Sequence, residues 1–236
     1  MTRSKILTAG MMFSGLLPAS AWASLLTVTT YSMPNGDNGT YVYLDTTYTP
    51  CPANSCTTIG AQLSGGLGRL TNGVIPTTDW NVNGNAAGWI DWAIGAPNNT
   101  DPTVTFTFAH NSTINSVSIV FDNSLGYGGI LPPASVTIDG ANYAITASSI
   151  EGPETVTISG LDLTGSDATV QFFQDTAEPS VGESMMIGQV SFNGTASVSA
   201  APEPGSVFLI GGGLLAALIA LNLRRGNRGA NKARPA

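Results

Sequence analysis

The sequence predicts an all-β fold, an antiparallel β-sandwich or jelly roll, followed by one C-terminal transmembrane helix. Two observations predict the sandwich: short runs alternate apolar and polar residues, and Gly, Pro, Asn and Asp separate those runs. No stretch between residues 25 and 199 shows a convincing helical period. Strands that follow one another without intervening helices favour antiparallel sheets packed face to face.

Six runs rich in Val, Ile, Thr and Phe account for most of the expected strands. They cover residues 102–109, 113–122, 134–140, 154–163, 168–175 and 187–194. Asp139 and Gly140 form a turn pair that predicts a hairpin at the end of the third run. We expect the β-domain to span residues 24–195 and to include residues 25–60, the alternative being that these form a decoration on it.

The first 23 residues have the layout of a secretory signal peptide. Arg3 and Lys5 precede an apolar stretch, residues 6–17, and the small residues Ala21 and Ala23 provide a cleavage site. As a helix this stretch is about 18 Å long, too short for a hydrocarbon core of about 30 Å. We therefore expect residues 1–23 to be removed on export, an uncleaved anchor being the alternative.

Charge is distributed unevenly along the chain. Residues 24–200 contain 14 acidic residues and a single Lys or Arg, Arg69, which gives a formal charge of −13. A surface of this sign repels phosphate backbones, so nucleic acid is excluded as a partner.

The sequence contains two cysteines, Cys51 and Cys56. An oxidising compartment outside the cytoplasm would allow them to form a disulfide. A metal clip and a redox pair are the alternatives, but the single histidine, His110, lies far away in the sequence.

The C-terminal region predicts a membrane anchor. Residues 206–223 are 18 uncharged residues, and such a helix, about 27 Å long, is just sufficient to span a membrane. The basic residues that follow, Arg224, Arg225 and Arg228 among them, keep residues 224–236 cytoplasmic by the positive-inside rule.

A short motif precedes this span. Pro202, Glu203 and Pro204 end a small-residue linker, residues 196–205. Motif, span and basic end together resemble the PEP-CTERM sorting signal of exopolysaccharide-producing Gram-negative bacteria. The resemblance implies that an exosortase, a membrane-embedded transpeptidase-like enzyme, cuts the anchor, so that an inner-membrane precursor becomes a cell-surface or extracellular protein. A plain tail anchor is the alternative.

Landmarks in the body of the chain occur in a characteristic order. They are "LTNG" at residues 70–73, Trp80, "GWIDW" at 88–92 and "IGQVSFNG" at 187–194. This order resembles the galactose-binding-like, discoidin-type jelly roll, which implies that the early loop lies near the last strand and that a structural calcium ion binds between them. Asn72 and Gln189 occupy the positions where acidic ligands are expected, and neutral amides lower the affinity for calcium. The alternative is that both residues only form hydrogen bonds in turns. No other cofactor is expected.

Three tryptophans lie close together after the signal peptide: Trp80, Trp89 and Trp92. Alternation along the strands predicts that Trp80 and Trp89 belong to the core. Trp92, just before a loop-like segment, is expected at the surface. Together with Asp91 it is the candidate sugar-binding residue.

Catalysis has little support in the sequence. His110 has no neighbouring nucleophile and acid, and Glu151 and Glu154, which could form a glycosidase pair, lie in a Gly-Pro turn. We therefore expect a non-catalytic surface or extracellular-matrix protein associated with exopolysaccharide. A carbohydrate-binding module is the alternative, and a secreted glycan hydrolase is a weaker one. An exposed aromatic ring in a concave patch would favour binding, whereas burial of all three tryptophans would favour a structural role.

Overall fold

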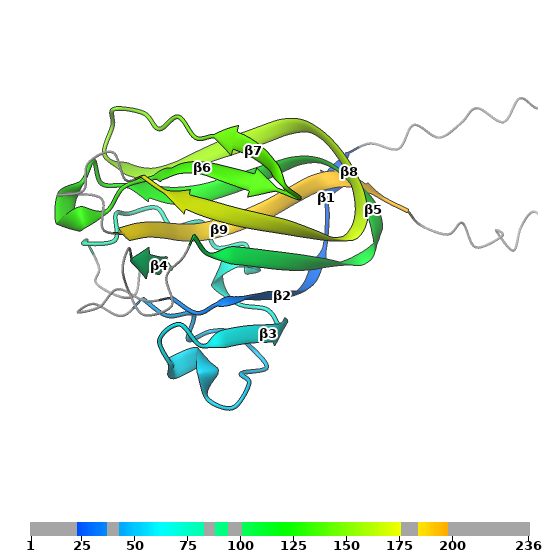
Figure 1. The fold of residues 1–236 in the computed structure, drawn as a ribbon, viewed down its shortest axis with the longest axis horizontal. Coiled ribbons are helices and arrows are strands. Elements are labelled where there is room, and N and C mark those ends of the chain that lie inside the picture. Colours follow the sequence, from blue (N-terminus) through cyan, green and yellow to red (C-terminus); the bar gives the residue numbers. More distant parts are fainter. Residues whose placement is uncertain (1–22, 37–42, 83–87, 94–100, 176–183, 198–236) are drawn as a thin grey trace, which may run out of the picture. The chain divides into compact units, whose positions relative to one another are not determined.

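Two long strands, β5 (Thr103–Asn123) and β8 (Gly152–Gln174), form the frame of the fold. The structure is a computed structural model that describes residues 23–36, 43–82, 88–93, 101–175 and 184–197. β5 and β8 pair antiparallel almost from end to end, and shifts of register near Ser112 and Ser116 bend the ribbon that they form. Figure 1 shows this ribbon curving back on itself at one end of the molecule, so that its two halves lie in different layers.

The remaining strands extend both layers. They are β1 (Ser24–Leu25), β2 (Val28–Pro34), β3 (Gln62–Gly66), β4 (Ile90–Ala93), β6 (Pro133–Ile138), β7 (Ala141–Ala144) and β9 (Ser184–Ala196). The hydrogen-bonded order is β1-β9-β5-β8-β6-β7; β2 pairs with β5 and β3, and β4 pairs with β9. All pairs of named strands are antiparallel, and the described residues contain only short 3₁₀ turns in addition. The prediction of an antiparallel all-β fold is confirmed.

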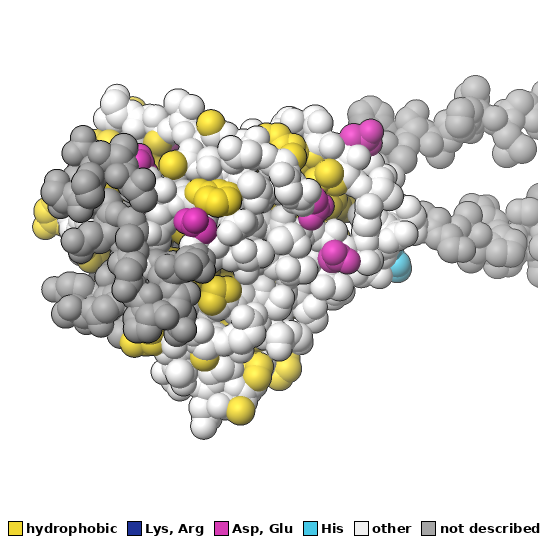
Figure 2. Space-filling model, in the orientation of Figure 1, with side chains coloured by type: hydrophobic (Ala, Val, Ile, Leu, Met, Phe, Trp, Pro, Cys, Tyr) yellow, Lys and Arg dark blue, Asp and Glu magenta, His cyan; other side chains and the backbone are white. Residues whose placement is uncertain are grey.

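Alternate residues of the bent ribbon fill the core between the layers. Phe106 and Phe108 from the first half of β5 lie 4.9 and 5.1 Å, between ring centroids, from Phe192 of β9. All three rings are buried, and burying each contributes about 1.5–3 kcal/mol. Figure 2 shows that the described surface on one side is mostly polar and uncharged, with separate acidic side chains.

The bend explains why four of the expected strands merge into two. Residues 102–109 and 113–122 were expected as separate strands, but the polar residues between them stay extended and only shift the register. In β8, positive φ angles at Gly160 and Asp162 accommodate the same bend. The hairpin at Asp139 and Gly140 is confirmed, since both have positive φ and Ile138 pairs with Ala141 across a two-residue turn.

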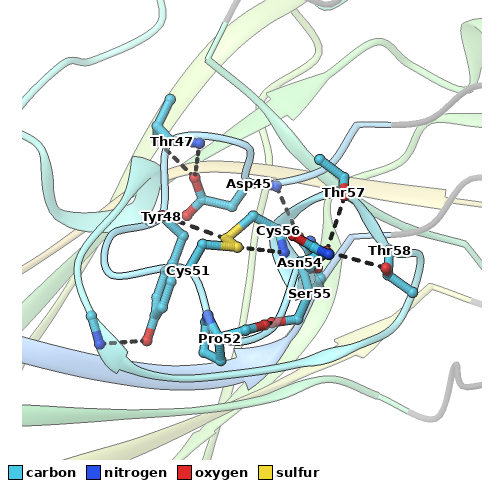
Figure 3. Close-up of a disulfide and its surroundings, with 12 residues drawn as sticks. Asp45, Thr47, Tyr48, Cys51, Pro52, Asn54, Ser55, Cys56, Thr57 and Thr58 are labelled. Carbon is cyan, nitrogen blue, oxygen red and sulfur yellow. Dashed lines mark hydrogen bonds between the residues drawn. A yellow bond between two sulfur atoms is a disulfide. The ribbon is translucent and has the colours of Figure 1, made fainter.

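The segment before β3 is attached to this core by a buried carboxylate. Asp45 accepts hydrogen bonds from the backbone N–H of Arg69 (3.0 Å), from the Thr47 hydroxyl (2.7 Å) and from the buried Tyr31 hydroxyl. Burial raises the pKa of the Tyr31 hydroxyl, and the nearby Asp45 carboxylate raises it further. The hydroxyl therefore stays protonated and donates the hydrogen bond. Figure 3 shows the adjoining loop, where a disulfide joins Cys51 to Cys56.

None of the helices in the described ranges is long and apolar enough to cross a membrane. The expected span, residues 206–223, and nearly all of the expected signal peptide lie outside these ranges.

Trp92 lies in the core, so the prediction of a surface ring is wrong. Its side chain is 2% exposed, its ring stacks on Phe172 with centroids 6.0 Å apart, and its indole N–H donates to the Pro34 carbonyl at 3.1 Å. The neighbouring Asp91 is also fully buried. The physical reason is that all four residues of β4 are buried, so alternation along this strand does not distinguish an outer face.

We predict that Trp92→Ala lowers the free energy of unfolding by about 3–5 kcal/mol, because the change leaves a cavity against Phe172 and removes the hydrogen bond to Pro34. Urea denaturation followed by circular dichroism measures the change. Val82→Ala, at a side chain that is 59% exposed, is the control and is expected to alter stability by less than about 0.5 kcal/mol. Equal stability of the Trp92→Ala variant and the unmodified protein would contradict the prediction.

Candidate functional site

The loops at one end of the β-sandwich bring aromatic rings and carboxylates together. At this end Asn123, the last residue of β5, pairs with Gly152, the first residue of β8. At the other end Ser24 pairs with Gly194, close to where the chain enters and leaves the β-domain. Figure 1 shows the two ends well separated along the strands. We call the first the loop end.

An aromatic pair marks the loop end. Trp80 is partly exposed and packs edge-on against the buried ring of Tyr43, with centroids 6.1 Å apart. On another side its centroid lies 6.4 Å from that of Tyr127, and the two ring planes are inclined by 37°. Tyr127 is 62% exposed, so it presents most of its ring to solvent.

A tight turn holds Tyr127 in this position. Tyr127 begins the 3₁₀ turn η4 (Tyr127–Gly129), in which Gly128 has a φ of 64°. A Cβ atom at Gly128 would collide with Cζ2 of Trp80, so the turn approaches the indole this closely only because the residue is glycine. The aromatic pair is therefore fixed by backbone geometry as well as by ring contact.

Asp122, next to the end of β5, connects the two loops that carry the aromatic pair. Its buried carboxylate accepts a hydrogen bond from the backbone N–H of Trp80 at 2.8 Å and another from the Ser124 hydroxyl. Burial raises the pKa of Asp122, and the carboxylates of Asp79 and Glu151 raise it further, while the two hydrogen bonds act in the opposite direction. Asp79 and Glu151 are therefore close enough for their charges to act on Asp122.

The two outer carboxylates belong to neighbouring loops at the loop end: Asp79 directly precedes Trp80, and Glu151 directly precedes Gly152. Asp79 is partly exposed, but its Oδ1 atom is buried and accepts no hydrogen bond; a Cβ on Gly152 would lie 3.5 Å from that oxygen. Glu151 is exposed and directly precedes β8. The indole N–H of Trp80 is likewise buried without a partner. Unpaired buried polar atoms are uncommon in folded proteins, and here two occur on adjacent residues.

A hollow of about 320 Å³ borders the loop between β5 and β6. Its size is at the lower end of the range for small-molecule pockets. Its lining includes Leu125, Pro132, Pro133, Ala147, Ser148 and Asp175. The Asn123 amide, which donates to the carbonyls of Ser148 (2.9 Å) and Ile150 (3.2 Å), fixes the wall formed by the loop before β8.

Glu154 has a structural role in this wall. Both of its carboxylate oxygens accept the backbone N–H of Ser148 at 3.0 Å, and one also accepts from the Asn123 amide. Of the two glutamates considered as a glycosidase pair, only Glu151 thus has a carboxylate directed to solvent rather than to the backbone.

Asn72 and Gln189 lie near each other, as the jelly-roll resemblance implies for the early loop and the last strand. Gln189 accepts the backbone N–H of Gly73 at 3.2 Å, and Asn72 accepts that of Val74 at 2.8 Å. Both amide oxygens are thus engaged in hydrogen bonds and neither carries a charge. Within the described ranges no group of three or more His, Cys, Asp or Glu residues could hold a metal ion. Neither Asn72 nor Gln189 therefore offers a calcium ion a charged ligand.

One of the three tryptophans lies where the sequence did not predict it. Trp89 is fully buried, as predicted, and Trp80 is partly exposed but packs against a buried cluster, whereas Trp92, expected at the surface, is buried. Tyr127 was missed, although "GYGG" at residues 126–129 places a large aromatic ring among glycines between two strands, a pattern typical of a presented side chain. Asp79 and Asp122 contact residues that are far away in the sequence, so no local sequence pattern predicts their positions.

Comparison with known proteins identifies the C-terminal signal. Residues 200–225 match the family described as the PEP-CTERM protein-sorting motif, which confirms the resemblance carried by residues 202–204. This motif, together with Arg224, Arg225 and Arg228, lies outside the described residues. A comparison with curated protein sequences gives no match.

The chain is also similar to solved structures of carbohydrate-binding modules. One is the family 32 module from C. perfringens NanJ in complex with galactose: 10% identity, 44% of this chain and 75% of that chain covered, TM-score 0.30. Another is the GH31 module CBM32-2 bound to GalNAc: 12% identity, 72% of this chain and 98% of that chain covered, TM-score 0.34.

We predict that Asp122 makes stability depend on pH. The native carboxyl keeps its proton to a higher pH than in the unfolded chain, where its pKa is near 3.8. Its contribution to the free energy of unfolding therefore falls as the pH rises from about 4 through the native pKa, and is constant above it.

Urea denaturation at a series of pH values measures this effect as the difference between the unmodified protein and Asp122→Asn. The difference is expected to shrink with rising pH. The exposed Asp167→Asn is the control for replacing a carboxylate at the surface. A difference for Asp122→Asn that grows with pH would show that its pKa is lowered.

Proposed function

We propose that the protein is exported, sorted by its C-terminal signal and displayed outside the cell, where its β-domain binds carbohydrate without catalysing a reaction. The observation that carries the binding function is the exposed ring of Tyr127 beside Trp80 at the loop end, with the carboxylates of Asp79 and Glu151 next to it.

The chemistry of this cluster suits a sugar. A pyranose offers one face of C–H groups, which packs on an aromatic ring, and a rim of hydroxyls, which donate to carboxylate oxygens. The partly exposed Trp80 and the largely exposed Tyr127 supply the apolar surface. The exposed Glu151 and the partly exposed Asp79 supply carboxylate acceptors.

The cluster is also held in place before any ligand binds. Asp122 ties the backbone of Trp80 to the end of β5, and Gly128 allows η4 to pack on the indole. A surface that is already ordered loses little conformational entropy on binding, which raises affinity. These contacts support a binding site rather than a chance exposure of one tyrosine.

A purely structural surface protein, associated with exopolysaccharide through no dedicated site, is the second candidate. Burial of Trp89 and Trp92 is the observation that favours it. The exposed Tyr127 beside Trp80 favours binding instead. A hydrolase is supported least, because Glu154 holds the Ser148 backbone and leaves Glu151 without its expected partner carboxylate.

The C-terminal signal supports the proposed export and sorting of the protein. We propose that residues 206–223 anchor the precursor in the inner membrane and that an exosortase cuts near the motif at 202–204, leaving the β-domain at the surface or in the exopolysaccharide.

For the binding function we predict that Tyr127→Ala weakens affinity for the polysaccharide of the host cell roughly three- to tenfold, the effect of losing one aromatic contact. Isothermal titration with the full-length protein in neutral detergent measures it. Leu25→Ala, at a side chain that is 68% exposed at the opposite end, is the matched control and is expected to bind unchanged. Unaltered binding by Tyr127→Ala would contradict a sugar site at the loop end.

For the sorting function we predict that replacing Pro202, Glu203 and Pro204 by alanine leaves the precursor uncut in the host membrane. Immunoblots of membrane and extracellular fractions compare this variant with Ser197→Ala, which lies before the matched motif. Equal release of the two variants would exclude recognition through Pro-Glu-Pro.

A further inference from the structure

We propose that the loop-end site takes a glycan whose sugar units carry a free amine, an ammonium-bearing polysaccharide, in preference to a neutral or acidic one. This inference rests on the proposed carbohydrate-binding function and names the ligand class of the same site.

The β-domain offers almost no positive charge to balance its carboxylates. Residues 24–200 carry a formal charge of −13, and their single Lys or Arg is Arg69. The Arg69 guanidinium donates to the Trp89 carbonyl at 3.2 Å, a contact with a neutral group. Figure 2 shows acidic side chains and no Lys or Arg on the described part of the face in view. A cationic polymer is therefore attracted to this domain, and an anionic one is repelled.

Negative charge is also concentrated at the site itself. Asp79 Oδ1 accepts no hydrogen bond, and because the rest of this side chain is partly exposed, its charge acts on the adjoining solvent. Glu151 adds a second carboxylate that is exposed. Both lie close to the buried Asp122 in the structure: Asp122 accepts the backbone N–H of Trp80, which follows Asp79, and pairs with Pro153, two residues after Glu151.

An ammonium group satisfies such a site better than a hydroxyl does. It carries three N–H donors and a positive charge, whereas a sugar hydroxyl supplies one donor and no charge. Both donors form charge-assisted hydrogen bonds with a carboxylate, but only the ammonium adds the attraction between opposite charges. A carboxylate on a uronic acid would meet like charges at the same place and would be disfavoured.

The aromatic rings add to this preference. A cation within about 6 Å of the centroid of a Trp or Tyr ring is attracted to the face of the ring. Trp80 directly follows Asp79, and its centroid is 6.4 Å from that of Tyr127. The proposal places the amine at the Asp79 carboxylate and the sugar ring that carries it against the aromatic pair.

The test compares the affinities of three oligosaccharides of equal length. They are the glucosamine tetramer, its fully N-acetylated counterpart and a uronic acid tetramer. Isothermal titration with the full-length protein in neutral detergent, at low ionic strength, is expected to give at least about tenfold tighter binding of the amine. Added salt should reduce that preference. The uronic acid should not bind measurably.

Two sets of variants separate the local from the general effect of charge. The double variant Asp79→Asn, Glu151→Gln is expected to lose most of the preference for the amine, because it weakens binding of the glucosamine tetramer more than binding of the N-acetylated one. The matched control is Asp162→Asn, Asp167→Asn, which removes two exposed carboxylates from the bend of β8 and should keep the preference. Tyr127→Ala should weaken both ligands.

Each remaining outcome decides a different question. Equal affinity for the amine and the N-acetylated tetramer would overturn the amine preference and leave carbohydrate binding in place. Failure to bind any of the three ligands or the host polysaccharide would overturn the proposed function itself. Equal loss of preference in the control variant, or equally tight binding of a lysine tetramer, would show general attraction of cations and would overturn the inference.

Discussion

The pairing of β5 with β8 is the constraint on which the rest of the structure depends. This ribbon extends from Thr103↔Gln171 to Asn123↔Gly152, and its bend places one half in each layer. Because side chains alternate along a strand, a slip of one residue would turn the buried Phe106 and Phe108 outward together. The same register sets which loop residues meet at the loop end. Core and candidate site are therefore determined by one set of hydrogen bonds.

The register of β5 and β8 also determines which side chains lie at the loop end. Asp122 lies one residue before the end of β5, where its carboxylate is buried and must find donors. It finds them in the Trp80 backbone, 42 positions earlier, and in Ser124. Trp80 in turn supports Gly128 and Tyr127. A buried polar group that needs partners thus positions aromatic side chains that could not be ordered by their own loops.

How much of this could be predicted from the sequence depends on the range of the interaction. Alternation of apolar residues gives the strands, and Asp139-Gly140 gives the hairpin, because both are local properties. The merging of strands within β5 was not predicted, since polar residues at a bend resemble those of a turn. Trp92 was misplaced because β4 is covered on both faces, a fact that depends on distant partners such as Phe172. The cluster around Asp122 brings together residues that are far apart in the sequence, so no local pattern predicts it.

The separation of the two ends of the sandwich links the fold to the sorting signal. The chain leaves the β-domain after β9, whose last residues pair near Ser24 and Ser112, whereas the aromatic pair belongs to loops at the other end of the strands. The described contacts that hold Trp80 and Tyr127 are made by Tyr43, by Asp122 and by the two rings with each other. The geometry of the loop end is therefore set by residues that precede the matched sorting motif in the sequence.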